Sequence, residues 1–401
     1  MGILSNRVAK VKPSATLAVT AKAKELKAAG RDVIGLGSGE PDFDTPDHIK
    51  QAAIEALNEG YTKYVAVAGM PELRTAIAKK YVDETGCDYT ADNTVVTVGG
   101  KQAFFNLAQA TLNEGDEVII PAPYWVSYPD MTLLADGTPV IVNTQESNGF
   151  KLTPAELEGA ITSRTKFVVI NSPSNPTGNA YSIAELKAIA EVLRKHPHVW
   201  VISDDIYEKI VYDGFEFATL VKVAPDLQDR TVILNGVAKA YSMTGWRIGY
   251  AVGPADVIKA MAKIQGQSTS NATSFAMKGA LEAITGPQDC VEPMLKAFKE
   301  RRDYVVGRLN AMPGVSCLTP EGAFYVYPNV AGLVGKKAPD GTDLKDTVAL
   351  ASWMLEAEGV AVVPGVAFGL DPYLRLSYAT SMEDLVKAMD RIEKVAKQLN
   401  S

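Results

Sequence analysis

Residues 231–252 read TVILNGVAKAYSMTGWRIGYAV and combine two strand patterns with an isolated lysine. Residues 231–234 and 248–252 are short apolar runs bounded by turn residues, which is typical of buried β-strands. Lys239 stands between them among small and apolar residues, although a lysine usually keeps its amine in water. Burial would lower the pKa of the amine from about 10.4 and make it a usable nucleophile or base, whereas an amine that reaches solvent along its own stem would stay inert.

The same short apolar runs recur through the middle of the chain. They predict further buried strands at 94–98, 117–120, 139–143, 166–170 and 199–203. Apolar residues at three- and four-residue spacing predict helices between them, at 71–84, 101–112 and 183–194. The run Thr45-Pro46-Asp47 predicts another helix, capped by Thr45 and ending near residue 58. Strands that alternate with helices indicate an α/β fold with a mostly parallel sheet covered on both faces.

The pattern changes near residue 290. A long charged helix at 292–310 precedes shorter strands at 322–327, 360–363 and 373–377 and a final amphipathic helix at 382–398. Because 401 residues exceed what one core usually holds, we expect two domains. The large domain is predicted at 46–290. A smaller α+β domain is predicted from 1–45, which includes a strand at 33–36, together with 291–401.

Composition excludes several classes of function. The net charge of −7, with no run of basic residues, argues against a nucleic acid or an anionic membrane as partner. The three cysteines (Cys87, Cys290, Cys317) are too few and too scattered for a disulfide framework, and the three histidines (His48, His196, His198) do not suggest a metal site. We see neither a membrane span nor an apolar signal core near the start, so we expect a cytoplasmic protein whose chemistry uses Lys, Asp, Tyr and Arg.

Polar and glycine-rich turns follow several of the predicted strands. Residues 171–178 (NSPSNPTG) and 203–207 (SDDIY) lie at carboxyl ends of strands, where open α/β sheets bind ligands. Residues 98–102 (VGGKQ) turn directly into a helix, whose free N–H groups favour an anion such as phosphate. Residues 35–39 (GLGSG) are not followed at once by a helix, so they fail as a dinucleotide fingerprint but leave room for a small ligand. A plain turn remains the alternative for each of them.

The order of these motifs along the chain is more specific than any one of them. Residues 175–178 (NPTG), Asp204 followed by Tyr207, Lys239 with Arg247 eight residues later, and Arg375 within residues 374–377 (LRLS) appear in this order. The set resembles the fold-type I pyridoxal-phosphate enzymes and, among them, the class I aminotransferases, over essentially the whole chain. The resemblance implies a large domain with a mostly parallel seven-stranded sheet between helices, a smaller α+β domain, and pyridoxal 5'-phosphate as cofactor.

The resemblance also implies a role for each cofactor-binding residue. Lys239 is expected to hold the cofactor as an imine and to shuttle a proton at the substrate α-carbon, and Asp204 is expected to pair with the pyridinium nitrogen. The remaining roles are hydrogen bonds to the phenolate oxygen from Tyr207 and Asn175, phosphate binding by Arg247 and the N–H groups at Gly100 beside Lys101, and stacking on the ring by Trp125.

Substrate recognition is implied in the same way. Arg375 and the backbone of Gly39 are expected to bind the α-carboxylate, next to Trp125 and Asn175. Tyr64 is expected to reach the phosphate of a neighbouring subunit, so a homodimer with shared sites is implied.

The group that binds the distal carboxylate departs from part of the family. Some aspartate aminotransferases use an arginine of the partner subunit, but residues 267–271 (QSTSN) contain none. The chain is instead similar to bacterial aspartate aminotransferases that carry the equivalents of residues 12–16 (KPSAT) and of Lys101. In that subgroup the equivalents of Lys101 and Thr16 bind dicarboxylic substrates, and the equivalent of Lys12 is implicated with prephenate.

The resemblance leads to one main expectation and two alternatives. We expect reversible amino transfer between L-aspartate and 2-oxoglutarate, with a second activity that converts prephenate to arogenate. A β-eliminating or cyclising lyase would share every cofactor-binding residue, and only the substrate-binding residues favour the aminotransferase. A non-enzymatic regulator on the same fold is the remaining alternative, although such regulators usually carry a basic DNA-binding domain ahead of it.

Overall fold

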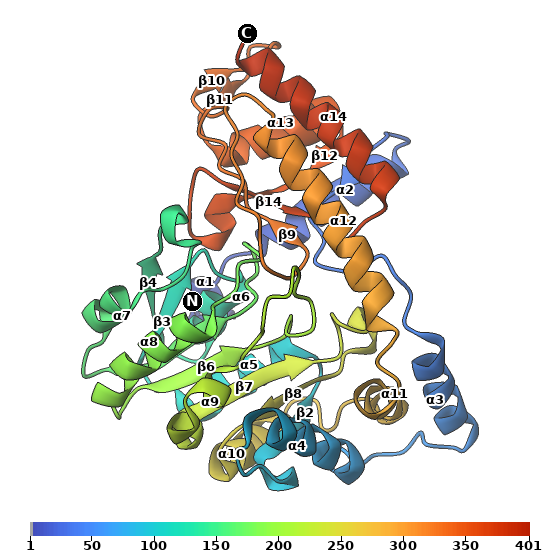
Figure 1. Ribbon diagram of the computed structural model, residues 1–401, viewed down its shortest axis with the longest axis vertical. Helices are drawn as coiled ribbons and strands as arrows, with labels where there is room; N and C mark the ends of the chain where they lie inside the picture. Colours follow the sequence, from blue (N-terminus) through green and yellow to red (C-terminus); the bar gives the residue numbers. More distant parts are fainter. Residues whose placement is uncertain (1–2) are drawn as a thin grey trace.

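Seven strands form the central sheet of the computed structural model, which describes residues 3–401 (Figure 1). Their order is β2-β8-β7-β6-β5-β3-β4. Neighbours from β7 to β4 are parallel, whereas β8 is antiparallel to both β2 and β7. The bounds are β2 (Thr94–Thr97), β3 (Glu117–Ala122), β4 (Thr138–Asn143), β5 (Thr165–Asn171), β6 (Trp200–Asp204), β7 (Thr231–Gly236) and β8 (Gly249–Val252). The prediction of a mostly parallel sheet is confirmed, and the bounds of the seven strands predicted within residues 94–252 lie within two residues of those observed.

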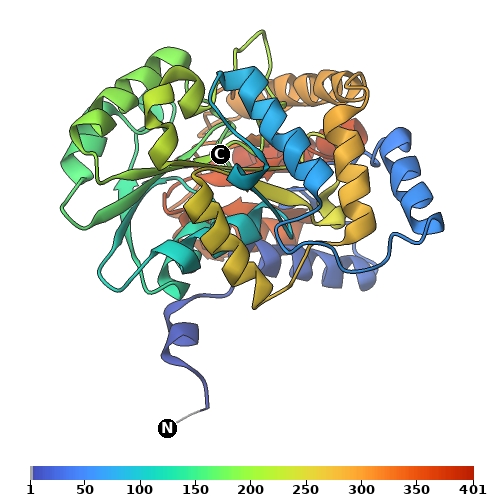
Figure 2. The ribbon, with the colours of Figure 1, turned by 90° about the horizontal axis from the view of Figure 1, so that it is seen from below.

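Helices cover both faces of this sheet because its strands are apolar on both faces (Figures 1 and 2). On β2, for example, Val95 packs with α5, α6 and α10, whereas Val96 packs with α4 and α11 on the other side. The helices around the sheet are α3 (Asp47–Asn58), α4 (Pro71–Thr85), α5 (Gly100–Thr111), α6 (Ser127–Leu134), α7 (Pro154–Ala160), α8 (Ile183–Lys195), α9 (Leu220–Val223), α10 (Ala255–Gly266) and α11 (Ser274–Thr285).

The start of α3 differs from the predicted cap. Pro46 is the N-cap residue, and no side chain caps the helix. The hydroxyl of Thr45 donates instead to the carbonyl oxygen of Ser242 at 2.7 Å and accepts from the indole N–H of Trp246 at 2.9 Å. The prediction was wrong because a tertiary contact of Thr45 replaces the local one.

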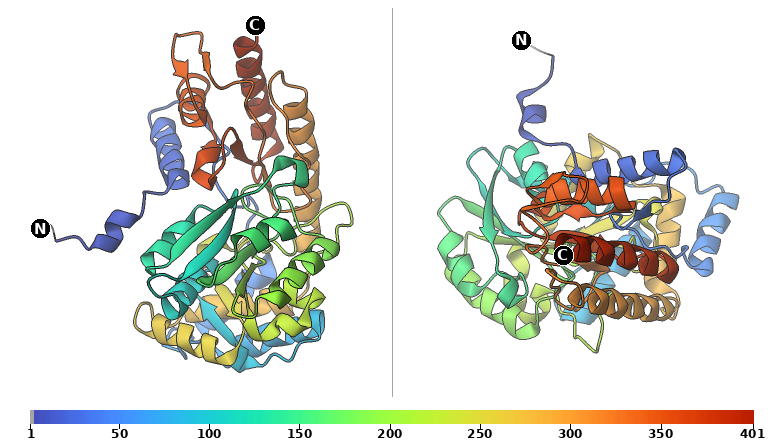
Figure 3. Two further views of the ribbon diagram at one scale, coloured as in Figure 1. Left: turned by 90° about the vertical axis from the view of Figure 1, so that its left-hand side faces the viewer. Right: turned by 90° about the horizontal axis from the view of Figure 1, so that it is seen from above.

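A second core, away from the central sheet, brings Ile34 and Leu36 together with the C-terminal part of the chain (Figures 1 and 3). Here α12 and α14 lie side by side, β1 pairs with β12 in parallel, and β13, β14 and β9 form an antiparallel sheet. The bounds are α1 (Asn6–Lys10), α2 (Ala15–Ala28), β1 (Ile34–Gly35), α12 (Val291–Asn310), β9 (Tyr325–Val326), β10 (Lys336–Lys337), β11 (Asp343–Leu344), α13 (Thr347–Glu358), β12 (Val360–Ala361), β13 (Val363–Pro364), β14 (Leu374–Ser377) and α14 (Met382–Leu399).

The run at 360–363 was predicted as one strand but belongs to two. Val360 pairs with Ile34, whereas Val363 pairs with Arg375 in a different sheet. All four residues of the run are buried, so their apolar character did not reveal the change of partner. The chain therefore crosses from one small sheet to the other within this run.

No helix among residues 3–401 is long and apolar enough to cross a membrane.

Candidate active site

Lys239 lies in the turn after β7, and its amine points at the glycine-rich turn near the start of the chain. The amine donates to the carbonyl oxygen of Gly39 at 2.5 Å and lies 5.9 Å from the ring centre of Tyr207 and 5.8 Å from that of Phe324. Burial lowers the pKa of the Lys239 amine to about 8, and the positive charge of Arg375 adds to this shift. A substantial share of this amine is therefore neutral near pH 8, in contrast to a lysine in solvent.

Asp204 ends β6 at the same edge of the sheet. The hydroxyl of Tyr128 donates to its Oδ2, and the backbone N–H of Ile206 donates to its Oδ1 at 3.3 Å. Burial raises the pKa of Asp204 to about 6, against the lowering effect of these hydrogen bonds. A partly buried carboxylate of this kind is suited to pair with a protonated nitrogen.

Arg375 is buried in β14 and is held by the main sheet and the first glycine turn together. Its Nη1 donates to Oδ1 of Asn175 at 3.0 Å, and its Nη2 donates to the carbonyl oxygen of Gly37 at 2.6 Å. Its Nε is buried and finds no hydrogen-bond partner within the described chain. An unpaired donor on a buried guanidinium is suited to receive a carboxylate.

An anion cradle lies where β2 turns into α5. Gly99 has φ of 77°, and no side chain caps the helix that starts at Gly100, so its first N–H groups are available. The guanidinium of Arg247 lies directly against this turn, because a Cβ at Gly99 would be 2.3 Å from its Nη2. Arg247 is oriented by donation from its Nη1 to the carbonyl oxygen of Thr244 at 2.8 Å.

A cavity of about 400 Å³ joins Lys239, Asp204 and the anion cradle, whereas Arg375 is not among the residues that line it and reaches this region through its contact with Asn175. It is lined by most of the predicted site residues, namely Gly39, Gly100, Lys101, Trp125, Asn175, Asp204, Tyr207, Lys239 and Arg247. One end therefore offers cationic and N–H groups for an anion, and the rest offers an amine, a carboxylate and aromatic rings.

Of the residues predicted to recognise the distal part of the substrate, Lys101 lines the cavity, whereas Lys12 and Thr16 do not. Lys101 is an exposed residue whose amine lies 5.2 Å from the ring centre of Trp125. Partial desolvation of this amine, followed by the positive charge of Arg247, lowers its pKa. Lys12 is exposed between α1 and α2. Burial raises the pKa of Asp130 on α6, whereas a hydrogen bond from the Lys12 backbone and the charges of Lys12 and Lys101 oppose that rise.

Thr16 and Tyr64 do not line the cavity. The hydroxyl oxygen of Thr16 on α2 is buried without a hydrogen-bond partner in the part of the chain that the structure describes. Tyr64, in the loop between α3 and α4, is 89% exposed. Neither side chain touches the cavity within this single chain.

Three further residues contact the site but had no role in the sequence prediction. The hydroxyl of Tyr128 donates to Asp204. Phe324 lies near the Lys239 amine, and Tyr325 lies within 2.8 Å of the Tyr207 hydroxyl. The run around residues 324–325 carried no indication in sequence, because short aromatic strands are common in cores.

The histidines and cysteines play no part in this site. Among residues 3–401, no group of three or more His, Cys, Asp or Glu side chains is placed to hold a metal ion. The imidazole of His196 lies 2.7 Å from Oε1 of Glu158 at the surface.

Comparison with known proteins places this geometry in context. Residues 31–392 match the model of the family described as aminotransferase class I and II. The chain is 58% identical to the aspartate/prephenate aminotransferase of Cereibacter sphaeroides, with 98% of each chain covered. It also superposes on the crystal structure of the aspartate aminotransferase from Rhizobium meliloti (TM-score 0.96, 48% identity, 100% of both chains). The aspartate aminotransferase from Thermus thermophilus with maleate is similar as well (TM-score 0.91, 47% identity, 98% of this chain and 100% of that one).

Proposed function

Because the chain belongs to the aminotransferase class I and II family, we propose that it transfers an amino group between L-aspartate and 2-oxoglutarate with pyridoxal 5'-phosphate as cofactor. The observation that carries this proposal is the buried amine of Lys239, with its pKa lowered to about 8, in a cavity that also holds Asp204 and the anion cradle at Gly100. A phosphate, an aromatic ring and an aldehyde each find a matching group in that cavity.

Each part of this cofactor has a matching group among the residues of the site. Arg247 and the N–H groups at the start of α5 suit its phosphate. Trp125 offers an aromatic face for the ring, and Asp204 offers a carboxylate for the pyridinium nitrogen. Lys239 would hold the aldehyde carbon covalently.

The chain's own residues then orient the substrate and move a proton. When bound, pyridoxal phosphate supplies a conjugated ring that withdraws electrons from the substrate α-carbon. Arg375 binds the α-carboxylate, with Asn175 holding the guanidinium in place. Lys239, whose lowered pKa leaves a share of its amine free of a proton, carries the proton away from and back to the substrate.

For the choice of substrate we infer a dicarboxylic amino acid and, in addition, prephenate, which would yield arogenate. Lys101 at the cavity and Thr16 near it are proposed to bind the distal carboxylate of aspartate, and Lys12 to contact prephenate. The approach of both lysines to Asp130 supports a common position for them. The relative from Cereibacter sphaeroides is named for both substrates.

A homodimer is proposed to complete the site. Tyr64 is 89% exposed and would reach the phosphate bound by a second copy of the chain. Ile3 and Leu4 near the start of the chain are exposed apolar residues that such a partner could cover. In the fold, α1 projects at the edge of the molecule (Figure 3) and is attached by ion pairs from Arg7 and Lys10 to Asp136, so the residues before it are placed where a second subunit could contact them.

We also propose the domain division and the location that the sequence suggested. Residues 46–290 would form the large domain, which is supported by the position of all seven strands of the central sheet within it. Residues 1–45 and 291–401 would form the small domain, supported by the pairing of β1 with β12, although residues 1 and 2 lie outside the described part. Cys87, Cys290 and Cys317 are all free within residues 3–401, which supports a cytoplasmic protein.

The proposal is tested with the purified protein loaded with pyridoxal phosphate. Wild type should show a visible absorbance band that shifts when aspartate is added and returns when 2-oxoglutarate follows. Lys239→Ala should lose the covalently bound chromophore and at least 10⁴-fold of turnover, since both nucleophile and proton carrier are removed. Lys187→Ala, an exposed lysine on α8, serves as the matched control. Full turnover by Lys239→Ala would refute the assignment.

A further inference from the structure

Tyr325 on β9 touches three of the proposed site residues at once. Its hydroxyl oxygen lies 2.8 Å from that of Tyr207, and either hydroxyl can donate. The guanidinium carbon of Arg375 lies 4.7 Å from the centre of its ring. A Cβ added at Gly39 would lie 2.5 Å from its hydroxyl oxygen. One fully buried side chain therefore separates the proposed cofactor contact from the proposed carboxylate contact.

Backbone pairing fixes the segment that carries Tyr325 from two sides. On one side, the N–H of Ala323 donates to the carbonyl oxygen of Ile210 at 2.9 Å, three residues beyond Tyr207. On the other side, Tyr325 is in register with Ser377 of β14, two residues beyond Arg375. The strand is thus joined to both of the segments that Tyr325 contacts through its side chain.

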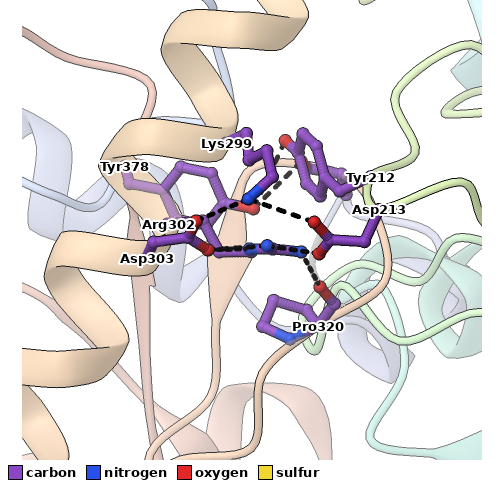
Figure 4. A network of polar contacts seen from close by, with 8 residues as sticks. Tyr212, Asp213, Lys299, Arg302, Asp303, Pro320 and Tyr378 are labelled. Atoms are coloured by element: carbon purple, nitrogen blue, oxygen red, sulfur yellow. Dashed lines mark hydrogen bonds and ion pairs between the residues drawn. The ribbon is translucent and has the colours of Figure 1, made fainter.

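A polar network around the buried side chain of Arg302 fixes the same segment just before Tyr325 (Figure 4). Arg302 on α12 donates from Nη1 to the carbonyl oxygen of Pro320 at 3.0 Å and from Nη2 to Oδ2 of Asp213 at 2.6 Å. The hydroxyls of Tyr212 and Tyr378 both donate to the carbonyl oxygen of Ala323. In Figure 4 the side chains of Arg302, Tyr212 and Tyr378 lie close together between helix α12 and the loop at residues 212–213. The position of Tyr325 is therefore set by packing that does not involve any ligand.

We propose that Tyr325 is a positioning residue that holds the hydroxyl of Tyr207 and the guanidinium of Arg375 in one fixed arrangement. The inference rests on the proposed function, because Tyr207 and Arg375 are assigned there to the cofactor and the substrate carboxylate. It adds Tyr325, which is not assigned to contact the cofactor or the substrate carboxylate. Tyr325 acts on Tyr207 through its hydroxyl and on Arg375 through its ring.

The hydroxyl and the ring of Tyr325 have separable effects. When Tyr207 donates to the cofactor phenolate oxygen, its own oxygen is free to accept from Tyr325, and this makes Tyr207 the stronger donor. A stronger donor favours the charged phenolate and keeps the chromophore at Lys239 unprotonated to lower pH. The ring instead supports the Arg375 guanidinium through its electron-rich face.

The test compares Tyr325→Phe, which removes only the hydroxyl, with Tyr325→Leu, which removes the ring as well. For each holoenzyme, the visible absorbance of the bound cofactor is titrated against pH, and the dissociation constant of maleate is measured by the absorbance change. Tyr325→Phe should raise the pH midpoint by about 0.5–1 unit and change maleate affinity less than about 2-fold. Tyr325→Leu should raise the midpoint similarly and weaken maleate binding about 3–10-fold.

Tyr327→Phe is the matched control. Tyr327 is a buried tyrosine two residues away whose hydroxyl donates to the backbone oxygens of Gly365 at 3.1 Å and Leu370 at 3.0 Å. The loss of this hydroxyl in Tyr327→Phe should leave the pH midpoint of the bound cofactor unchanged. An equal shift in Tyr327→Phe would mean that the effect is merely structural, and this would overturn the inference.

The remaining outcomes also decide the question. A Tyr325→Phe holoenzyme with the wild-type midpoint would refute the positioning role while leaving the aminotransferase proposal intact. A wild-type protein with no aspartate-sensitive band would overturn both. If Tyr325→Phe does not fold, Gly39→Ala displaces the same hydroxyl by its new Cβ, and its midpoint should rise in the same way. An unchanged midpoint in Gly39→Ala would then refute the role.

Discussion

Arg375 and Asn175 are joined by a hydrogen bond of 3.0 Å from Nη1 to Oδ1, although one lies in β14 and the other in the turn after β5. The backbone N–H of Asn175 in turn donates to Oδ1 of Asn171 at 2.9 Å, which ends a strand of the central sheet. The arginine proposed to bind the α-carboxylate is thereby oriented by the same turn that lines the cofactor cavity.

Asn175→Ala should weaken the binding of all substrates by a similar factor. Without the Asn175 side chain, the carbonyl oxygen of Gly37 is the one hydrogen-bond acceptor left to Arg375 in the described chain. The guanidinium is then no longer held in a single orientation. We expect KM values for aspartate, glutamate and a monocarboxylic amino acid such as alanine to rise together by about 10-fold, the effect of about 1.4 kcal/mol. Steady-state kinetics with the three donors measure this, and a rise limited to dicarboxylic donors would contradict it.

Lys101→Ser should separate substrates by their distal group. The lysine amine lies beside Trp125 at the cavity, so its loss removes a charge from the proposed distal-carboxylate position. We expect kcat/KM for aspartate to fall about 10–100-fold, the range of a lost charged hydrogen bond, while alanine changes less than about 3-fold. Lys263→Ser, at an exposed position on α10, controls for the change in net charge. Unchanged aspartate kinetics in Lys101→Ser would refute its role.

Gly99→Ala should weaken cofactor binding. A Cβ at Gly99 would lie 2.3 Å from Nη2 of Arg247, and the φ of 77° disfavours any side chain there. We expect the dissociation constant of pyridoxal phosphate to rise at least about 10-fold, because the guanidinium must leave the anion cradle. Gly115→Ala has a comparable φ of 93° but an open surrounding, so it reproduces the backbone strain alone. Equal losses in both variants would assign the effect to strain.

Lys239→Met should stabilise the cofactor-free protein near neutral pH. The folded pKa of Lys239 is about 8 against an ordinary value of 10.5, so below pH 8 the amine is charged in both states and its burial costs stability. Between pH 8 and 10.5 the unfolded chain binds a proton that the folded protein has released, so the stability of wild type rises towards that of the variant. We expect a gain of about 3 kcal/mol at pH 7 that shrinks above pH 8.

Urea unfolding of cofactor-free protein at pH 7, 8.5 and 9.5 measures that difference. Lys187→Met, at an exposed position, should show no such dependence on pH. A gain in Lys239→Met that stays constant across this range would show that folding does not lower the pKa of the amine, and it would contradict the prediction.

The strands were predictable from sequence, as was the grouping of several candidate residues at one cavity, because their cause is local. Val95 and Val96 are both buried on opposite faces, so a strand between two helical layers is apolar throughout and stands out in sequence. Lys239 stood out for the opposite reason, as a charge among apolar neighbours. Asp204 and Asn175 follow strands directly, and the carboxyl ends of parallel strands meet at one edge of the sheet.

The role of Tyr325 was not predictable because its cause is tertiary. Its contacts with Tyr207 and Arg375 depend on the register of β9 against β14 and on the bridge between residues 211 and 322. Short strands in the second core carry too few residues to specify that register by pattern. The division of residues 360–363 between two sheets was not predicted, for the same reason.

The pairing of β1 with β12 has a consequence for how the chain is made. Ile34 is synthesised more than 300 residues before its partner Val360. At about 5–20 residues per second, β1 waits tens of seconds for its neighbour while the central sheet between them is completed. The edge of β1 is therefore paired only after Val360 and Ala361 have been made, and a product truncated before them would keep that edge open to aggregation.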